Sequence, residues 1–295
     1  MSDQNALLTK EELKSPAVFL FGAVYIFAVV LSVSSSPSQG LVYLGMSAAI
    51  SLLAWLILDL TKGMRIPDIQ ARAPWLEIAF GLLTYLVFEF TPYLDFGDEW
   101  NLGEVLKKGL LLFILPYVFL RLRKHPPSSM GLSSSNWKQN LKVAGIVLAC
   151  MAVPSIFFIS DTANLILEGQ ITLAKALPAF FIYFTHNALR SGLPEEFFYR
   201  VFLQTRLSQA LKSRLGGILI TSLLFGLVHI PYVMRWYPEM TLAEAFCSAF
   251  FIQGFTGLVY GVLWERSHSL LPGTIVHSGL NALNNVGAAV ALIFP

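Results

Sequence analysis

The sequence predicts an all-α fold, a polytopic bundle of transmembrane helices. Of its 295 residues, 55% are hydrophobic and 13% are charged, whereas a soluble domain carries about 25% charged residues. The mean hydropathy is +0.64, and the apolar residues are gathered into long runs. A chain of this composition folds in a bilayer, and its net charge of +2 gives no indication of nucleic-acid binding.

The long apolar runs set the expected number of membrane spans. A helix needs about 20 apolar residues to cross a hydrocarbon core about 30 Å thick. Two of the candidate runs are weaker than the others, because Gly109–Leu120 is short and Leu173–Leu189 is ambiguous. We therefore expect eight to nine spans, near Ala17–Ser36, Leu41–Leu60, Trp75–Tyr93, Gly109–Leu120, Leu141–Ser160, Leu173–Leu189, Gly216–Met234, Ala243–Trp264 and Leu270–Phe294.

The positions of Lys and Arg between these spans predict the orientation, since cytoplasmic loops carry an excess of both. With the N-terminus inside, all but four of the 20 Lys and Arg residues fall in inner segments; the four are Lys107, Lys108, Lys175 and Arg235. We therefore expect the N-terminus inside and the segment of Glu195 on the cytoplasmic side. The polar N-terminus lacks a secretory signal pattern, and compact loops favour a prokaryotic plasma membrane.

The chain divides into two unequal parts. Residues 1–125 predict N-terminal transmembrane helices of unassigned role, with few polar groups inside the spans. Residues 126–139 predict an exposed cytoplasmic loop, because they carry Pro-Pro-Ser-Ser followed by a run of three serines. Residues 140–295 contain the motifs that carry chemistry.

Two adjacent carboxylates, Glu195 and Glu196, follow Pro194. Proline suits the first turn of a helix, and the macrodipole favours carboxylates there, so we expect a helix to begin at Pro194. On that helix Glu196 and Arg200 share one face, with Glu195 about 100° away. We therefore expect Glu196 to pair with Arg200 and Glu195 to be available as a base, although such a string taken alone is more often a solvated helix start.

Each of the next two long apolar stretches carries a histidine, His229 and His277. His277 and Asn281 are four residues apart, so they share one helix face and are expected to point into the bundle. Ionisable groups inside membrane segments are costly, and they mark functional sites by default. Two histidines, an asparagine and an acidic pair in three successive segments favour a hydrolase buried in the bilayer.

The ordered motifs Glu-Glu-x-x-x-Arg, Phe-x-x-x-His and His-x-x-x-Asn resemble those of the CPBP family of intramembrane glutamic proteases. That family includes the type II CAAX prenyl endopeptidases and the bacteriocin-processing proteases. All three motifs are complete, and they comprise Glu195, Glu196, Arg200, Phe225, His229, His277 and Asn281. The resemblance covers about residues 176–290 and implies a protease core with a conical active-site cavity in the C-terminal half.

The resemblance implies an endopeptidase that hydrolyses a peptide bond of a membrane-associated or lipidated peptide without a metal or other cofactor. Glu195 with His229 would activate a water, and His277 with Asn281 would donate hydrogen bonds to the oxyanion. Glu196 and Arg200 would orient the site. The implied partners are a peptide or membrane-protein substrate and the lipid bilayer, and no residue identifies the substrate.

Other chemistries stay open beside this one. The zincin motif His-Glu-x-x-His is absent, yet Glu195, His229 and His277 would supply three ligands to zinc. A membrane scaffold would use the same polar set as a structural network, and a proton-coupled transporter would use it as a relay. A hydrolase requires the four proposed catalytic side chains to converge within about 4–8 Å of one another, whereas a transporter requires repeat-related broken helices, which the sequence does not indicate.

Overall fold

The computed structural model describes residues 7–64, 69–94, 96, 100–132, 136–158 and 162–294. Every regular element within these ranges is a helix, which confirms the predicted all-helical membrane bundle. Part of the predicted loop, Ser133–Ser135, lies outside the described residues.

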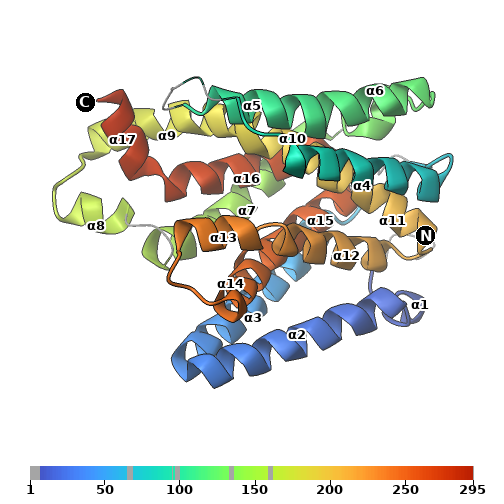
Figure 1. Ribbon diagram of the computed structural model, residues 1–295, viewed down its shortest axis with the longest axis horizontal. Helices are drawn as coiled ribbons and strands as arrows, with labels where there is room; N and C mark the ends of the chain where they lie inside the picture. Colours follow the sequence, from blue (N-terminus) through green and yellow to red (C-terminus); the bar gives the residue numbers. More distant parts are fainter. Residues whose placement is uncertain are drawn as a thin grey trace. The chain divides into compact units, whose positions relative to one another are not determined.

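Figure 1 shows the helices in chain order. The first part of the chain forms α1 (Lys10–Leu13), α2 (Pro16–Ser35), α3 (Pro37–Leu60), α4 (Pro74–Phe90), α5 (Leu102–Lys108), η1 (Gly109–Ile114), α6 (Leu115–Leu122) and η2 (Pro127–Met130). The second part forms α7 (Trp137–Phe158), α8 (Thr162–Leu167), α9 (Leu173–Asn187), η3 (Ala188–Gly192), α10 (Leu193–Glu196), η4 (Phe197–Gln204), α11 (Thr205–Ala210), α12 (Arg214–Leu227), α13 (Ile230–Trp236), α14 (Leu242–Ser248), η5 (Ala249–Gly254), α15 (Phe255–Ser267), α16 (Leu270–Asn284) and α17 (Val286–Ile293). The segments η1, η3, η4 and η5 are π-helical, so their backbone hydrogen bonds join residues five apart instead of four.

The helices are grouped into two compact units. Unit 1 comprises Met1–Lys62, Asp68–Ala79 and Phe202–Arg266, and unit 2 comprises Gly63–Pro67, Phe80–Val201 and Ser267–Pro295. Each unit combines segments from both halves of the chain. The predicted division at residues 126–139 therefore does not coincide with the boundary between the units.

Unit 1 is built on an aromatic core. Its helix α2 packs against α3 and α12, and η5 packs against α12. Phe250, Phe251 and Phe255 are buried together with Tyr43, whose ring stacks on that of Phe251 with centroids 4.7 Å apart. Close approach of η5 to α12 requires Gly226, because a Cβ there would lie 3.1 Å from a backbone carbonyl of η5.

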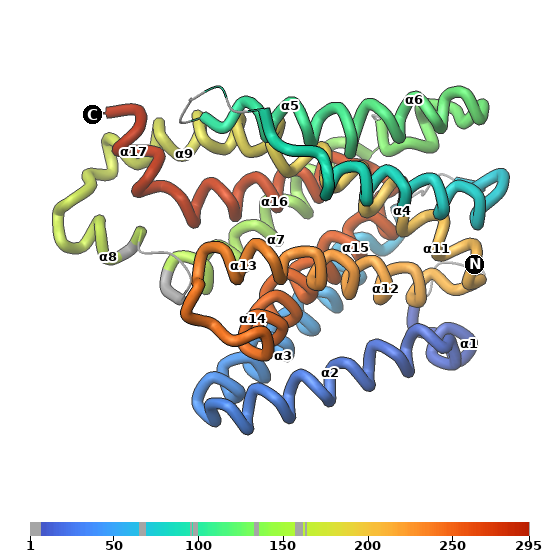
Figure 2. The backbone as a smooth tube through the Cα atoms, viewed as in Figure 1, coloured from blue at the N-terminus to red at the C-terminus, as the bar shows by residue number. Residues whose placement is uncertain are grey.

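Unit 2 is centred on α16, which packs against both α7 and α9 (Figure 1). The last helix, α17, lies against α9 (Figure 2). Small residues let these helices approach closely, as in many membrane bundles. A Cβ on Gly192 would lie 2.2 Å from Ser278 Oγ, and a Cβ on Gly279 would lie 2.6 Å from the side chain of Leu148.

Five helical segments are long and apolar enough to cross a membrane: Pro16–Ser35, Pro37–Leu60, Trp137–Ile156, Arg214–Trp236 and Leu242–Ser267. They correspond to five of the predicted spans. The remaining predicted spans are helical but shorter, interrupted or more polar, and a total of eight to nine spans stays a prediction.

One local expectation is wrong. The stretch Leu270–Phe294 is not one helix, because α16 ends at Asn284, Asn285 has non-helical dihedral angles (φ −122°, ψ 20°), and α17 begins at Val286; the side chain of asparagine competes with helical backbone bonding. In the predicted loop, residues 126–128 are exposed, whereas Met130 has no exposed surface; the cytoplasmic side of this loop stays a prediction. The next residue, Gly131, accepts a backbone hydrogen bond from Leu270 at 3.1 Å.

The substitution Gly192→Ala tests the contact between η3 and α16. The added methyl group would overlap Ser278 Oγ, so we expect the free energy of unfolding to fall by about 1–3 kcal/mol. The control Gly145→Ala meets nothing within 4 Å and should raise stability by about 0.5–1 kcal/mol. Thermal unfolding in detergent measures both, and equal effects of the two substitutions would contradict the close contact.

Candidate active site

The acidic pair lies inside a helical run that continues from α9 to α11. The prediction of a helix start at Pro194 is wrong, because Gly192 already has helical dihedral angles (φ −56°, ψ −55°). Proline is tolerated there because the π-helical η3 precedes it, and the hydrogen-bonding pattern already departs from that of an α-helix. The two carboxylates therefore depend on side-chain partners and not on the N-terminus of a helix.

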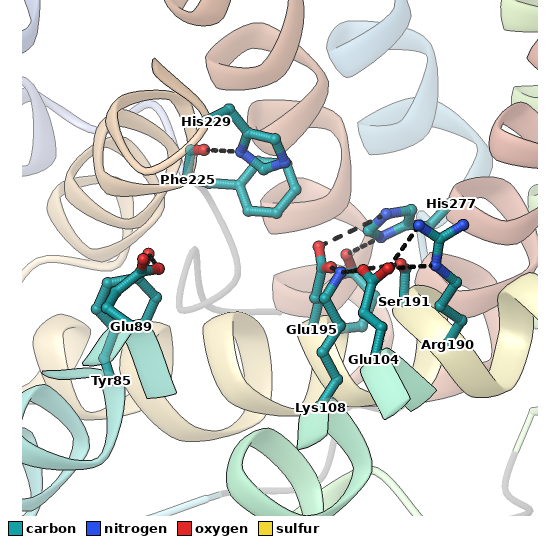
Figure 3. Close-up of polar contacts among 11 residues, drawn as sticks. Tyr85, Glu89, Glu104, Lys108, Arg190, Ser191, Glu195, Phe225, His229 and His277 are labelled. Carbon is teal, nitrogen blue, oxygen red and sulfur yellow. Dashed lines mark hydrogen bonds and ion pairs between the residues drawn. The ribbon is translucent and has the colours of Figure 1, made fainter. Parts of the chain in front are cut away.

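His277 of α16 lies between the two glutamates. Its Nδ1 donates to Glu196 Oε1 at 3.0 Å, and its Nε2 lies 3.8 Å from Glu195 Oε2 (Figure 3). The other oxygen of Glu196 lies 3.4 Å from Arg200 Nε, so the expected tie between Glu196 and Arg200 is present. All four side chains are at most 8% exposed, and the charges are therefore held in a medium of low polarity.

The two carboxylates contact different nitrogens of His277. With Glu196 accepting from Nδ1 and pairing with Arg200, its position and the ring plane of His277 fix each other. This is the geometry by which a carboxylate orients a histidine whose other nitrogen acts on a reacting group. Glu195 faces that second nitrogen.

The other two residues predicted from the sequence as catalytic are His229 and Asn281. His229 belongs to unit 1, where its Nδ1 donates to the carbonyl of Phe225 at 2.6 Å (Figure 3); in the neutral ring this leaves the acceptor lone pair on Nε2. Asn281 follows His277 by one turn of α16, and its backbone carbonyl accepts from Asn285 Nδ2 at 2.8 Å. The convergence of His229 and Asn281 with Glu195 stays a prediction.

Sequence reasoning missed the cations beside Glu195. Lys108 Nζ lies 2.7 Å from Glu195 Oε1 and 2.8 Å from Glu104 Oε1, and Arg190 Nε donates to Glu104 Oε2 at 2.8 Å (Figure 3). The one signal in the sequence was the four-residue spacing of Glu104 and Lys108, which fits an ion pair on a helix.

This ion pair bears on the predicted orientation. Two atoms 2.7 Å apart lie at one depth in the bilayer, whereas the charge count assigns Lys108 to an outer segment and Glu195 to an inner one. The two assignments do not hold together. The helical run from α5 to α6 carries Lys107 and Lys108 in its interior, so these residues belong to a helix and not to a loop between spans.

Metal ligation has its own geometric requirement, which is three or more ligands around one point. Among the residues that the structure describes, no group of three His, Cys, Asp or Glu side chains meets it.

Fold and site together define an integral membrane protein with two buried carboxylates joined to an imidazole. Residues 177–283 match the family model described as type II CAAX prenyl endopeptidase Rce1-like. The match confirms the family that the motifs predicted, and it spans every motif residue from Glu195 to Asn281. This part of the chain is therefore similar to the CAAX-type intramembrane protease domain. No curated protein and no solved structure matches the chain.

The substitution Glu196→Gln tests the buried pair with Arg200. Removing one charge leaves the arginine without its carboxylate at 1% exposure, so we expect the free energy of unfolding to fall by about 3–5 kcal/mol. The matched control is Glu168→Gln in unit 2, since Glu168 is exposed and its substitution should change little. Denaturation in detergent measures both; an unchanged stability of Glu196→Gln would mean that the pair has no structural weight.

Proposed function

We propose that this protein is an intramembrane glutamic endopeptidase in which Glu195 activates the hydrolytic water. The observation that carries the proposal is the contact of His277 with both glutamates inside the matched region. A buried carboxylate opposite an oriented imidazole supplies a general base and a hydrogen-bond donor, which together support peptide hydrolysis without a covalent intermediate.

The proposed reaction begins with a water between Glu195 and His229. Glu195 takes a proton from the water, and the oxygen attacks the carbonyl carbon of the peptide bond. His277 Nε2 and the amide of Asn281 donate hydrogen bonds to the resulting oxyanion. The oxyanion collapses as the C–N bond breaks, and the proton held by Glu195 passes to the leaving amine.

Glu196 supports this reaction through the orientation of His277. Because Nδ1 donates to Glu196, donation to an oxyanion requires a second proton on Nε2, so His277 acts in its doubly protonated form. Arg200 holds the other oxygen of Glu196. Both residues are orienting groups in this proposal and do not touch the substrate.

The proposed substrate is a membrane-associated peptide, lipidated or not, that reaches a conical cavity from the cytoplasmic side. We place the protein in a prokaryotic plasma membrane with its N-terminus inside. The charge bias supports this orientation even when Lys107 and Lys108 are left out of the count, because only Lys175 and Arg235 then remain in outer segments.

The substitution Glu195→Gln tests the proposed base. It keeps the shape of the side chain but removes the proton acceptor, so turnover should fall by about 10²–10⁴-fold. The assay uses the protein reconstituted in liposomes and internally quenched peptides that end in Cys-aliphatic-aliphatic-X, with and without a prenyl group. Glu168→Gln is again the matched control.

The comparison with Glu196→Gln separates the roles of the two carboxylates. If Glu195→Gln stays fully active while a folded Glu196→Gln is inactive, base and orienting residue must be exchanged. If both variants cleave the peptides as well as the wild type does, Glu195 and Glu196 do not form a glutamic protease site.

Dialysis against a strong chelator tests the alternative in which the same residues bind zinc. Glu195 and His229 would activate the water without a metal, so turnover of the quenched peptides should survive dialysis. A loss of turnover that zinc restores specifically, and magnesium does not, would assign Glu195, His229 and His277 as ligands.

A further inference from the structure

The helical run α5–η1 carries a residue that contacts Glu195 from outside the matched region. Three side-chain contacts connect this run and the segment preceding it to the run α9–α10, and all of them lie within unit 2. These contacts join His186 Nε2 to the Trp100 backbone carbonyl at 2.7 Å, Arg190 Nε to Glu104 Oε2 at 2.8 Å, and Lys108 Nζ to Glu195 Oε1 at 2.7 Å. The residue numbers rise together along both runs, so the two lie parallel at these contacts.

The number of residues between successive contacts differs between the two runs. Successive contacts are four residues apart on the α5 side, where Glu104 and Lys108 share one face of α5 and Trp100 precedes the helix. On the other side, Arg190 and Glu195 are five residues apart. The π-helical η3, Ala188–Gly192, lies at that longer step, and its hydrogen bonds join residues five apart. The extra residue therefore keeps Glu195 in register with Lys108.

Lys108 uses its full donor capacity in this network. An ammonium group has three N–H donors, and Nζ lies within hydrogen-bonding distance of Glu195 Oε1 at 2.7 Å, Glu104 Oε1 at 2.8 Å and Ser191 Oγ at 3.2 Å. The side chain is 13% exposed. With one oxygen of Glu195 held by Lys108, its other oxygen faces His277 Nε2.

We propose that Lys108 is a positioning residue for Glu195: it fixes one carboxylate oxygen so that the other faces His277 and the hydrolytic water. This inference rests on the proposed role of Glu195 as the base. Lys108 acts through Glu195 and does not touch the substrate. A displacement of about 1 Å at a reacting group lowers the rate by about 10²-fold, so loss of this contact acts on kcat.

The first experiment compares Lys108→Met with Lys107→Met in the liposome assay with the quenched peptides. Lys107 is the matched control, because it is the neighbouring lysine on α5. Its Nζ lies over the rings of Phe88 and Tyr93, 4.3 Å and 4.0 Å from the ring centroids. We expect kcat to fall by about 10²-fold for Lys108→Met with KM nearly unchanged. Lys107→Met should keep the wild-type kcat, and equal kcat values for the two variants would overturn the proposal.

The second experiment separates positioning from the balance of buried charge. The double variant Lys108→Met/Glu104→Gln removes one cation and one anion, so Arg190 and Glu195 still balance each other. We expect the double variant to recover the thermal stability that Lys108→Met loses while kcat stays low. Recovery of kcat together with stability would show a purely structural role and would overturn the proposal.

A third variant, Lys108→Arg, keeps the charge and should recover part of the kcat. The Glu195→Gln variant is measured in the same assay. If wild-type protein cleaves the peptides and Glu195→Gln does not, the proposed function holds, and only the Lys108 variants decide the inference. If Glu195→Gln cleaves as fast as the wild type does, the proposed function itself is wrong, and Lys108 has no base to position.

Discussion

The contact between His277 and Glu196 is the constraint on which the candidate site depends. It joins α16 to the helix of the acidic pair through a hydrogen bond of 3.0 Å, so the two helices must approach closely. Glycine makes that approach possible on both sides. Besides Gly192, a Cβ on Gly273 would lie 3.0 Å from Glu196 Oε2. Packing of small residues and chemistry of large polar ones are therefore parts of one arrangement.

The buried charges of two clusters are paired with opposite charges. In unit 1, Arg206 Nε lies 2.9 Å from Glu77 Oε2, and both side chains are at most 1% exposed. In unit 2, Glu104, Lys108, Arg190 and Glu195 sum to zero charge. Such pairs contribute little net stability compared with apolar side chains, because desolvation offsets the attraction. Their effect is on the positions of the side chains, because each buried charge is stabilised only beside its partner.

The sequence predicted the features that rest on composition and on fixed motifs. The membrane bundle followed from long apolar runs, and the pairing of Glu196 with Arg200 followed from helical spacing. The helix start at Pro194 failed, because proline marks a boundary only in a regular α-helix, and η3 is not one. Lys108 was missed since a contact across 87 positions leaves no periodic signal in a single sequence.

The π-helical step between Arg190 and Glu195 also limits how the chain length can vary. Removing one residue from an α-helix turns everything beyond it by about 100°, and removing one from Ala188–Gly192 would restore an ordinary helical step. Glu195 would then rotate away from α5 although the helix remained intact. This segment therefore accepts exchanges of side chains more readily than insertions or deletions, and its length is as much a part of the site as the residues that line it.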